Sequence, residues 1–285
     1  LPTHRRKRNC RMEKRELVII GAGPAGLSAA IYGKRAGLDT LVLEKGRPGG
    51  QVLITSKIEN YPGILDGTGS GLADAFRTHA EHFKAEFRTA SVQKLEVRDG
   101  EKIITLKDGS EIAAGAVIVA SGASFRKQGC PGESTYTGMG VSYCATCDGM
   151  LYKGKTVAVI GDSEEARHDA KFLRDIGCKV LSFSGREKFD IRGGMKADTL
   201  VADGTEYAVD CVFILKDTLT AESLVSGIES ERGIIKTDRS CKTNIKGVFA
   251  AGDCTGAPYQ IAKAVGDGNI AALSACEYIN TEKEI

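Results

Sequence analysis

The residues of this chain best suited to chemistry are two cysteines separated by two residues, Cys144 and Cys147, with Asp148 directly after them. This spacing closes a small disulfide loop in which one sulfur can be accessible while the other is shielded. A thiolate is the attacking species in disulfide exchange, and a neighbouring carboxyl group can give or take the proton. The pattern therefore predicts a redox-active disulfide with these three residues as the catalytic residues.

A zinc site and a pair of inert thiols are the alternative interpretations of this motif. Zinc usually takes four ligands, but the chain has no second CxxC and no paired histidines. We therefore expect no metal. The nine cysteines are odd in number and otherwise scattered, unlike a secreted disulfide framework. A cytoplasmic protein, whose other thiols are small core residues, is the expectation.

Composition and charge exclude some classes of partner. The net charge is +2, so nothing in the overall charge favours nucleic acid. Seven of the first fifteen residues are Lys or Arg, and we expect residues 1–11 to be a disordered basic extension outside the fold. No apolar run reaches the roughly 20 residues that a membrane span needs. We expect neither a nucleic-acid nor a membrane partner.

Short apolar runs that lead into glycine recur along the chain. They are LVIIG at 17–21, TLVLEKG at 40–46, AVIVASG at 116–122, TVAVIG at 156–161 and GVFAAGD at 247–253. Because runs rich in Val and Ile are typical of strands buried on both faces, they predict parallel sheets. A helix pattern between the first two runs completes a strand–helix–strand unit, which residues 155–185 repeat.

Residues 86–112 alternate polar and apolar side chains and contain Asp-Gly turns, which predicts an antiparallel hairpin or meander. The prediction for the whole chain is an α/β fold with two Rossmann-like, three-layer nucleotide-binding domains, the second inserted in the first. The first domain is expected at 12–123 plus 240–285, and the CxxC-bearing second domain at 124–239.

The first strand–helix–strand unit carries a GxGxxG motif, Gly21-Ala22-Gly23-Pro24-Ala25-Gly26, with Glu44 at the end of the next strand. Glycines at these positions allow the tight turn, the close approach of a pyrophosphate and the packing of helix on strand. The helix N-terminus then faces the phosphates, and the acid accepts from ribose hydroxyls. An unphosphorylated ribose is favoured, as in FAD or NAD, and Asp253 could hold a second part of FAD.

Together these motifs resemble those of the low-molecular-weight thioredoxin reductases, flavoproteins that pass electrons from FAD through a CxxC pair to thioredoxin. The matching stretches are GAGPAG (21–26), GGQ (49–51), IENYPG (58–63), VASGA (119–123), CATCDG (144–149), GVFAAGD (247–253) and AVGDGNIAA (264–272). The resemblance implies a homodimer in which the first domain binds FAD. It also implies that Cys147 faces the flavin, Cys144 attacks the partner disulfide and Asp148 manages the proton.

The FAD-binding residues that we expect from the motif and the resemblance are Gly21, Gly23, Pro24, Ala25, Gly26, Glu44, Gly50, Gln51, Asn60, Ala120, Gly122, Gly252, Asp253, Gln260 and Ile261.

The second strand–helix–strand unit departs from the family pattern, in which it binds NADPH through a GxGxxA turn. Here the turn is Gly161-Asp162-Ser163-Glu164-Glu165-Ala166, so a serine side chain and extra acids stand where the pyrophosphate would lie. Of the expected arginines only Arg186 remains, and Asp190 replaces another. The following segment is short, and LKDTLTAE (215–222) replaces a glycine-containing stretch. We therefore predict a degenerate, shortened NADPH-type domain that has lost its nucleotide.

The predicted function is a flavin-dependent thioredoxin-disulfide reductase that acts on thioredoxin or a thioredoxin-like protein. The donor is then a ferredoxin or a deazaflavin. A ferredoxin near −400 mV lies about 130 mV below thioredoxin, which makes a two-electron transfer favourable by about 6 kcal/mol. The alternatives that the sequence leaves open are an ordinary NADPH-dependent thioredoxin reductase, a dithiol oxidase and a non-catalytic FAD-binding redox sensor.

Overall fold

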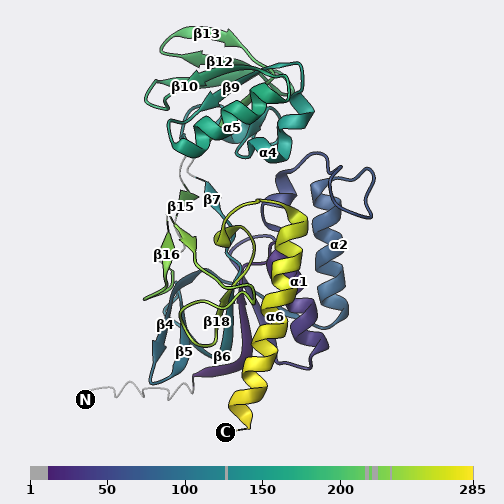
Figure 1. Cartoon of the computed structure of the whole chain (residues 1–285), viewed down its shortest axis with the longest axis vertical. Helices are drawn as coiled ribbons and strands as arrows, with labels where there is room; N and C mark the ends of the chain where they lie inside the picture. The colour runs from purple at the N-terminus through teal and green to yellow at the C-terminus, as the bar shows by residue number, and fades with distance from the viewer. Residues whose placement is uncertain (1–11, 126–127, 216–217, 220–223, 232, 285) are drawn as a thin grey trace, which may run out of the picture.

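The computed structural model describes residues 12–125, 128–215, 218–219, 224–231 and 233–284. The basic extension predicted for residues 1–11 lies outside them. Figure 1 shows two groups of elements, one with helices α1, α2 and α6 and the other with α4 and α5. No helix within the described ranges is long and apolar enough to cross a bilayer.

A mixed sheet is the centre of the first group. Its strand order is β3-β2-β1-β6-β5-β4, and β18 also pairs with β6. Strands β1, β2, β3, β6 and β18 pair in parallel, whereas β4, β5 and β6 pair antiparallel. The strands are β1 (Glu13–Ile20), β2 (Thr40–Glu44), β3 (Glu86–Thr89), β4 (Val92–Arg98), β5 (Glu101–Leu106), β6 (Glu111–Val119) and β18 (Val248–Ala250).

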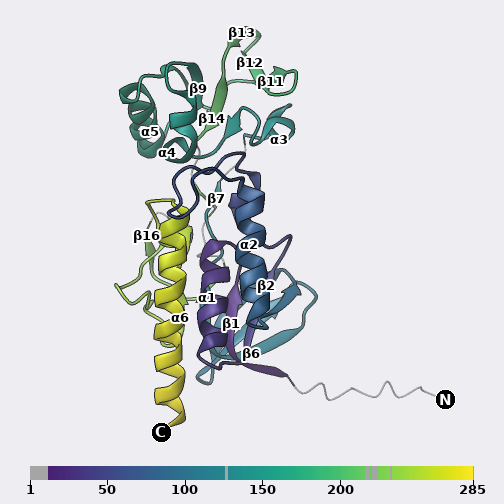
Figure 2. The ribbon, with the colours of Figure 1, turned by 90° about the vertical axis from the view of Figure 1, so that its right-hand side faces the viewer.

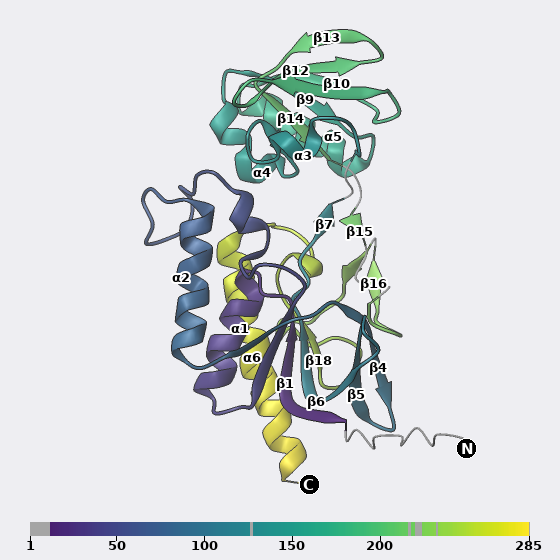
Figure 3. The same cartoon turned by 180° about the vertical axis from the view of Figure 1, so that it is seen from behind.

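The meander expected at 86–112 is present except for its first strand. β3 pairs in parallel with β2, because helix α2 (Gly69–His82) lies between them in the chain and forms the crossover. Helices α1 (Pro24–Arg35) and α6 (Ile261–Lys283) lie beside α2 on one face of the sheet (Figure 2). The meander strands β4 and β5 lie on the far side of β6 from β1, as Figure 3 shows from behind.

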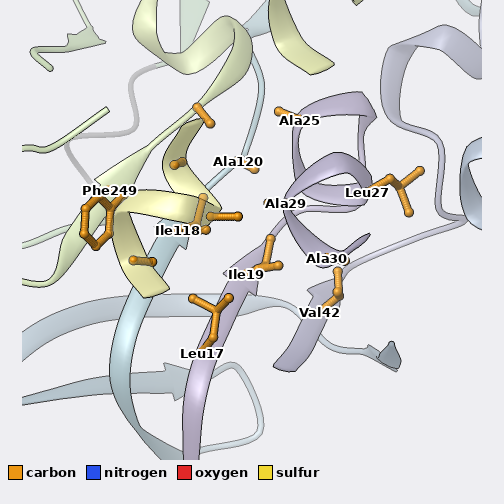
Figure 4. Close-up of a cluster of buried hydrophobic side chains, with 14 of the residues drawn as sticks. Leu17, Ile19, Ala25, Leu27, Ala29, Ala30, Val42, Ile118, Ala120 and Phe249 are labelled. Atoms are coloured by element: carbon orange, nitrogen blue, oxygen red, sulfur yellow. The ribbon is translucent and has the colours of Figure 1, made fainter. Parts of the chain in front are cut away.

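Strand β1 is buried on both faces, which explains its unbroken apolar run. Leu17 and Ile19 pack with Leu27 of α1 and Phe249 of β18 (Figure 4). Val18, on the other face, packs with a second cluster that includes residues of β4, β5 and β18. Each such fully buried side chain contributes about 2 kcal/mol relative to exposure. The packing of β1 therefore fixes the position of its carboxyl end, where the glycine turn into α1 follows.

The second group is built on the parallel sheet β10-β9-β14-β8, with α5 (Glu164–Asp175) crossing from β9 to β10. An antiparallel sheet, β11-β12-β13, packs beside it. The strands are β8 (Val141–Ser142), β9 (Thr156–Ile160), β10 (Lys179–Phe183), β11 (Phe189–Gly193), β12 (Ala197–Ala202), β13 (Thr205–Ala208) and β14 (Cys211–Ile214). The remaining helical turns are α3 (Glu133–Tyr136), α4 (Ala145–Asp148) and η2 (Gly149–Tyr152).

Two antiparallel strands join the groups. Strand β7 (Ser124–Phe125) pairs with β15 (Thr218–Leu219), so the chain leaves the first group and returns to it side by side. The predicted α/β fold class, with one Rossmann-like domain inserted in another, is therefore confirmed. Further short elements follow β15 or precede α6: β16 (Ser230–Glu231), β17 (Ile234–Ile235) and the 3-10 helix η4 (Gly252–Thr255), while η1 (Gly50–Ile54) follows β2.

Part of the segment that the sequence assigned to the second domain packs on the first sheet. Val225 and Ile235 are buried in the same cluster as β4 and β5, and the Leu95 N–H donates to the carbonyl oxygen of Leu224 over 2.7 Å. These contacts belong to the first sheet, although the sequence assigned residues 124–239 to the second domain. We therefore propose that the first domain resumes by residue 224 instead of 240.

Candidate active site

The turn between β1 and α1 needs glycine at two of its three motif positions for the fold alone. Gly21 has φ +104°, and a Cβ there would lie 2.3 Å from the carbonyl oxygen of Ala120. A Cβ on Gly26 would lie 1.9 Å from the carbonyl oxygen of Gly21. Backbone conformation at the first and close packing at both therefore exclude a side chain.

Gly23 differs, because the fold leaves room for a side chain there. Its φ is −76°, and a Cβ would meet only the Cα of Gly50, at 3.9 Å. Gly23 is the N-cap of α1 but gives no side-chain hydrogen bond to it, and Pro24 begins the helix. The first N–H groups of α1 are thus left for a ligand, and the empty space at Gly23 suits an anion.

Glu44 ends β2 beside this turn. Its Oε2 accepts from the Ala22 N–H over 2.8 Å, and its Oε1 accepts from the Gly46 N–H over 2.9 Å. Each carboxylate oxygen can accept a further hydrogen bond. The side chain is therefore held in place with acceptor capacity left over, and its hydrogen bonds to ribose hydroxyls stay a prediction.

The glycine turn and Glu44 open into a cavity of about 480 Å³. The predicted cofactor-binding residues that line it are Gly21, Gly23, Pro24, Ala25, Glu44, Gly50, Gln51, Asn60, Ala120, Gly122, Gly252, Asp253, Gln260 and Ile261. Gly26 does not line the cavity, because its place is between α1 and the turn. Residues of the second domain complete the wall, including Ser142, Tyr143, Cys144 and Asp148.

Polar side chains from distant segments meet at this cavity. The Gln51 amide donates to the carbonyl oxygen of Ala123, and Asn60 Nδ2 donates to Gln260 Oε1 over 3.1 Å. Asp253 also lines the cavity, and burial raises its pKa above the ordinary value. Both ends of the first domain thus contribute to one site.

The turn that carries Asp253 is held by a partly buried ion pair that the sequence analysis missed. Lys263 Nζ donates to the carbonyl oxygens of Gly252 (2.8 Å) and Gly256 (3.0 Å) and lies 2.9 Å from Asp267 Oδ2. The Asp267 carboxylate in turn accepts from the Gly252 N–H over 3.0 Å. The signal was a Lys–Asp pair four residues apart on one helix, with Asp267 inside the last stretch of the resemblance and Lys263 directly before that stretch.

The turn that carries Cys144 and Asp148, here called the redox turn, lines the same cavity. Cys144 is in a disulfide, and it precedes α4, which ends at Asp148. Burial raises the pKa of Asp148 above the ordinary range, and the Ser142 hydroxyl opposes this shift by donating to Oδ2 over 2.7 Å. The side chain of Cys147 lies outside the described part of the chain, so its pairing with Cys144 stays a prediction. The structure thus brings Cys144 and Asp148 to the cavity that holds the predicted cofactor residues.

Glu133 is a second residue that the sequence analysis missed. Its carboxylate is 2% exposed and accepts from the N–H groups of Gln128 (3.1 Å) and Gly129 (2.6 Å). It also accepts from the hydroxyl of Tyr143 over 2.8 Å, and burial raises the pKa of that hydroxyl to about 12. Glu133 therefore links Tyr143, the residue before Cys144, by hydrogen bonds to residues 128–129, which follow strand β7.

In the second glycine turn, between β9 and α5, protein side chains occupy groups that would otherwise bind a phosphate. Ser163 is the N-cap of α5, and its Oγ accepts from the Ala166 N–H over 3.1 Å. Arg186 Nη2 lies 3.2 Å from Asp162 Oδ2. The cap takes up one of the N–H groups that a pyrophosphate would use, and an acid holds the one surviving arginine.

The loop after β10 is bonded to itself in a similar way. Glu187 accepts from the N–H of Ser184 (3.1 Å) and from its hydroxyl (3.0 Å). Asp190 accepts from Arg192 over 2.7 Å. Acids thus accept from donors in residues 184–192, the loop after β10 and strand β11, where the resemblance implies a site for the 2′-phosphate. Of the stretch 215–222, only Leu215, Thr218 and Leu219 lie in the described residues.

Comparisons with known proteins identify the family to which the chain belongs. The sequence pattern of the pyridine nucleotide-disulphide oxidoreductase family matches residues 15–192 and 175–268. The thioredoxin reductase of Bacillus subtilis is 36% identical, covering 94% of this chain and 96% of that protein. A thioredoxin reductase structure from Streptococcus pyogenes has a TM-score of 0.85 at 32% identity, covering 95% of this chain and 100% of that one.

A further solved structure is a ferredoxin-flavin thioredoxin reductase from Clostridium acetobutylicum, with a TM-score of 0.62 at 36% identity, covering 96% of this chain and 100% of that one. Identity of this level extends over nearly the full length of each of these proteins. The chain therefore belongs to the pyridine nucleotide-disulphide oxidoreductase family and, within it, to the thioredoxin reductases.

Proposed function

We propose that this chain uses FAD to reduce the disulfide of thioredoxin or a thioredoxin-like protein, with electrons from a donor other than NADPH. The observation that carries the proposal is the single cavity that joins the glycine turn, Glu44 and Asp253 to Cys144 and Asp148. A cofactor in this cavity would have its phosphates at one wall and its reactive ring near the redox turn.

The residues of the cavity fit FAD. The space that a Cβ would fill at Gly23 and the uncapped N-terminus of α1 suit a pyrophosphate. Glu44 suits an unphosphorylated ribose, while Gln51, Asn60 and Gln260 offer donors and acceptors farther along. When bound, FAD supplies a ring that accepts electrons singly or in pairs and passes a pair to a disulfide.

The chain's own residues then carry out the exchange. The Cys144 thiolate attacks one sulfur of the partner disulfide, and the other partner sulfur leaves and takes a proton. Cys147 next displaces the second partner sulfur, so that the enzyme pair is oxidised to a disulfide as the partner is reduced to a dithiol. Asp148, whose pKa burial raises, supplies a proton to a leaving sulfur and regains one from a thiol.

Features of α5 argue against NADPH as the donor. At α1 the helix N-terminus is left for a ligand, whereas at α5 Ser163 caps it. Asp162 adds a negative charge that repels phosphate and pairs with Arg186. The two glycine turns of the same chain thus differ in the groups that a dinucleotide needs.

A ferredoxin or a deazaflavin is the donor we propose. Similarity to a ferredoxin-flavin thioredoxin reductase supports the first. A ferredoxin delivers single electrons, which a flavin can collect. We further propose that the protein is a homodimer and acts in the cytoplasm, where thiols stay reduced. The domain boundaries at 12–123 and 124 onward belong to the same proposal, with the return by residue 224.

An anaerobic flavin titration tests the donor and the cofactor together. The purified yellow protein is mixed with NADPH, NADH, reduced ferredoxin or a reduced deazaflavin, and the flavin absorbance is followed. We expect bleaching with ferredoxin or the deazaflavin and reoxidation when oxidised thioredoxin is added. Bleaching by NADPH within the mixing time would instead make the chain an ordinary NADPH-dependent enzyme.

A matched pair of variants sharpens the result. Ser163→Gly together with Asp162→Ala removes the cap side chain and the acid, whereas Asp175→Ala removes an exposed acid at the other end of α5. If the closed turn excludes NADPH, only the first variant gains bleaching by NADPH. Equal, fast bleaching of the wild type and both variants would contradict the proposed loss of the nucleotide site.

A further inference from the structure

Ser142 connects the two predicted catalytic residues that the structure describes. It ends β8, directly before Tyr143 and Cys144, and is 7% exposed. Its Oγ donates to Asp148 Oδ2 over 2.7 Å and accepts from the N–H of Cys144 over 3.2 Å. One hydroxyl therefore contacts both the carboxyl group and the backbone of the cysteine at the redox turn.

The same hydroxyl can also serve the protonated carboxyl. A hydroxyl has one proton to donate and two lone pairs with which to accept. When Asp148 is neutral, its O–H can donate to Ser142 Oγ, and the serine proton can turn to the carbonyl oxygen of Cys144, which lies 3.4 Å away. The Cys144 N–H keeps its acceptor in either case. Neither state of Asp148 leaves the serine hydroxyl without partners.

We propose that Ser142 is the positioning residue that holds the Asp148 carboxyl beside Cys144 in both of its protonation states. This inference rests on the disulfide exchange proposed above. During exchange the enzyme dithiol becomes a disulfide and the partner disulfide becomes a dithiol, so two protons pass from enzyme to partner. A carboxyl group that relays one of them changes charge in each cycle, and its hydrogen-bond partner has to suit both charges.

Other groups near Asp148 do not take this role. Tyr152 and Cys211 interact electrostatically with Asp148, and burial raises the pKa of both well above their ordinary values. Burial therefore favours the neutral form of both groups. Near α4, the side chains around Gly149 are apolar ones of Leu173, Ile176 and Phe172. Within the described residues, Ser142 is thus the polar group that donates a hydrogen bond to the Asp148 carboxylate.

Alkylation of Cys144 tests the proposal without donor, partner or turnover. The full protein is reduced with excess dithiol, and its reaction with iodoacetamide at Cys144 is followed by mass spectrometry from pH 5 to 9. In wild type we expect, besides the titration of the Cys144 thiol itself, an inflection that Asp148→Asn abolishes. Ser142 has partners in both states, but its charge-assisted 2.7 Å hydrogen bond to the carboxylate is the stronger one, so Ser142→Ala should move this inflection to higher pH. Ser142→Thr, which keeps a hydroxyl, should keep it near the wild-type position.

Ser28→Ala is the matched control, because the Ser28 hydroxyl is 6% exposed and donates to the carbonyl oxygen of Val265 over 2.8 Å. It should leave the inflection in place. An unmoved inflection in Ser142→Ala, or a wild-type profile that matches Asp148→Asn, would overturn the proposal. The second result would mean that Asp148 and Cys144 do not sense each other.

A turnover measurement distinguishes a failure of this inference from a failure of the proposed function. With the flavin kept reduced, Ser142→Ala should lower kcat/KM for oxidised thioredoxin about ten-fold, and should add little in an Asp148→Asn background, since the serine acts through the acid. Equal additional losses in both backgrounds would make the serine merely structural and would count against the role. A wild type that reduces no thioredoxin would remove the function, while the alkylation profile would still decide on Ser142.

Discussion

The side-chain amide of Asn60 donates to Oε1 of Gln260 over 3.1 Å, although 200 residues separate the two along the chain. Both residues line the same cavity. Asn60 follows the 3-10 helix η1, whereas Gln260 is the N-cap of α6 and gives it no side-chain hydrogen bond. The pair therefore links the segment after η1 to the start of α6 at the wall of the cavity.

Gln260→Ala should weaken FAD binding about five-fold, because it removes one wall contact and leaves Asn60 without this acceptor. The measurement is the recovery of flavin fluorescence quenching when FAD is added to the apoprotein. Asn280→Ala, which changes an exposed residue near the other end of α6, is the control and should bind FAD as wild type does. Equal affinities of the two variants would show that the pair has no part in cofactor binding.

Gly23→Ala separates the demands of the ligand from those of the fold. A methyl group meets only Gly50, at an ordinary 3.9 Å, so the apoprotein should unfold in urea at the wild-type midpoint. It also fills the space predicted for the pyrophosphate, so FAD affinity should fall ten-fold or more, about 1.4 kcal/mol or above.

Two further glycines provide the contrast for Gly23. Gly26→Ala places its methyl against the carbonyl oxygen of Gly21 and should destabilise the apoprotein itself. Gly194→Ala, which meets nothing within 4 Å, should alter neither property. A Gly23→Ala protein with normal FAD affinity would mean that the phosphates lie elsewhere.

Asp148→Asn should lower disulfide reduction about 100-fold, since a general acid of this kind contributes 10²–10⁴. The same substitution should raise the free energy of unfolding at neutral pH. Because the folded-state pKa of Asp148 is raised, the folded protein holds this proton more tightly, and wild type loses stability as the pH rises above the unfolded-state value near 4.

The asparagine variant lacks this loss. Urea unfolding at pH 4 and pH 8 should therefore show a stability difference in favour of Asp148→Asn that grows with pH. A difference that is constant from pH 4 to pH 8 would contradict the raised pKa. Asp210→Asn, at the neighbouring end of β14, would show whether any nearby acid produces the same effect.

Glu13 is the centre of a cluster of charged side chains at the start of β1, the end far from the glycine turn. Its carboxylate accepts from both Nη atoms of Arg88 over 2.8 Å and from Arg15 Nε over 2.9 Å. These hydrogen bonds, those of Arg88 first, lower the pKa of Glu13 to about 2. Its stabilisation is therefore complete above the unfolded-state value of 4.5 and is lost as the pH falls toward 2.

Glu13→Gln should cost about 1 kcal/mol at pH 7, a value kept small because water screens the partly exposed pair. The cost should vanish as the pH approaches 2. Glu101→Gln, whose carboxylate pairs with the exposed Lys14, is the control and should cost less than about 0.5 kcal/mol. Urea unfolding of both variants at pH 7 and at pH 3 measures the difference.

The chemistry-bearing turns could be predicted because each combines local residue types with a local geometry. The glycine turn, Glu44 and the CxxC turn are of this kind. Val225 and Ile235 could not be placed, since short apolar stretches between turns carry no sign of which sheet buries them. Ser142 and Glu133 also gave no signal, because a serine and a glutamate before a motif are common, and only the folded chain puts them against Asp148 and Tyr143.

The parallel pairing of β18 with β6 has a consequence for the order of events in the cell. The strand that completes the sheet, and the Asp253 turn and Gln260 that follow it, come from the last 40 residues of the chain, whereas the glycine turn comes from the first 30. While α6 is still being synthesised, the nascent chain has only part of the residues that line the cavity. Uptake of the proposed FAD would therefore be a late step of biosynthesis, which chains stopped short of β18 should never reach.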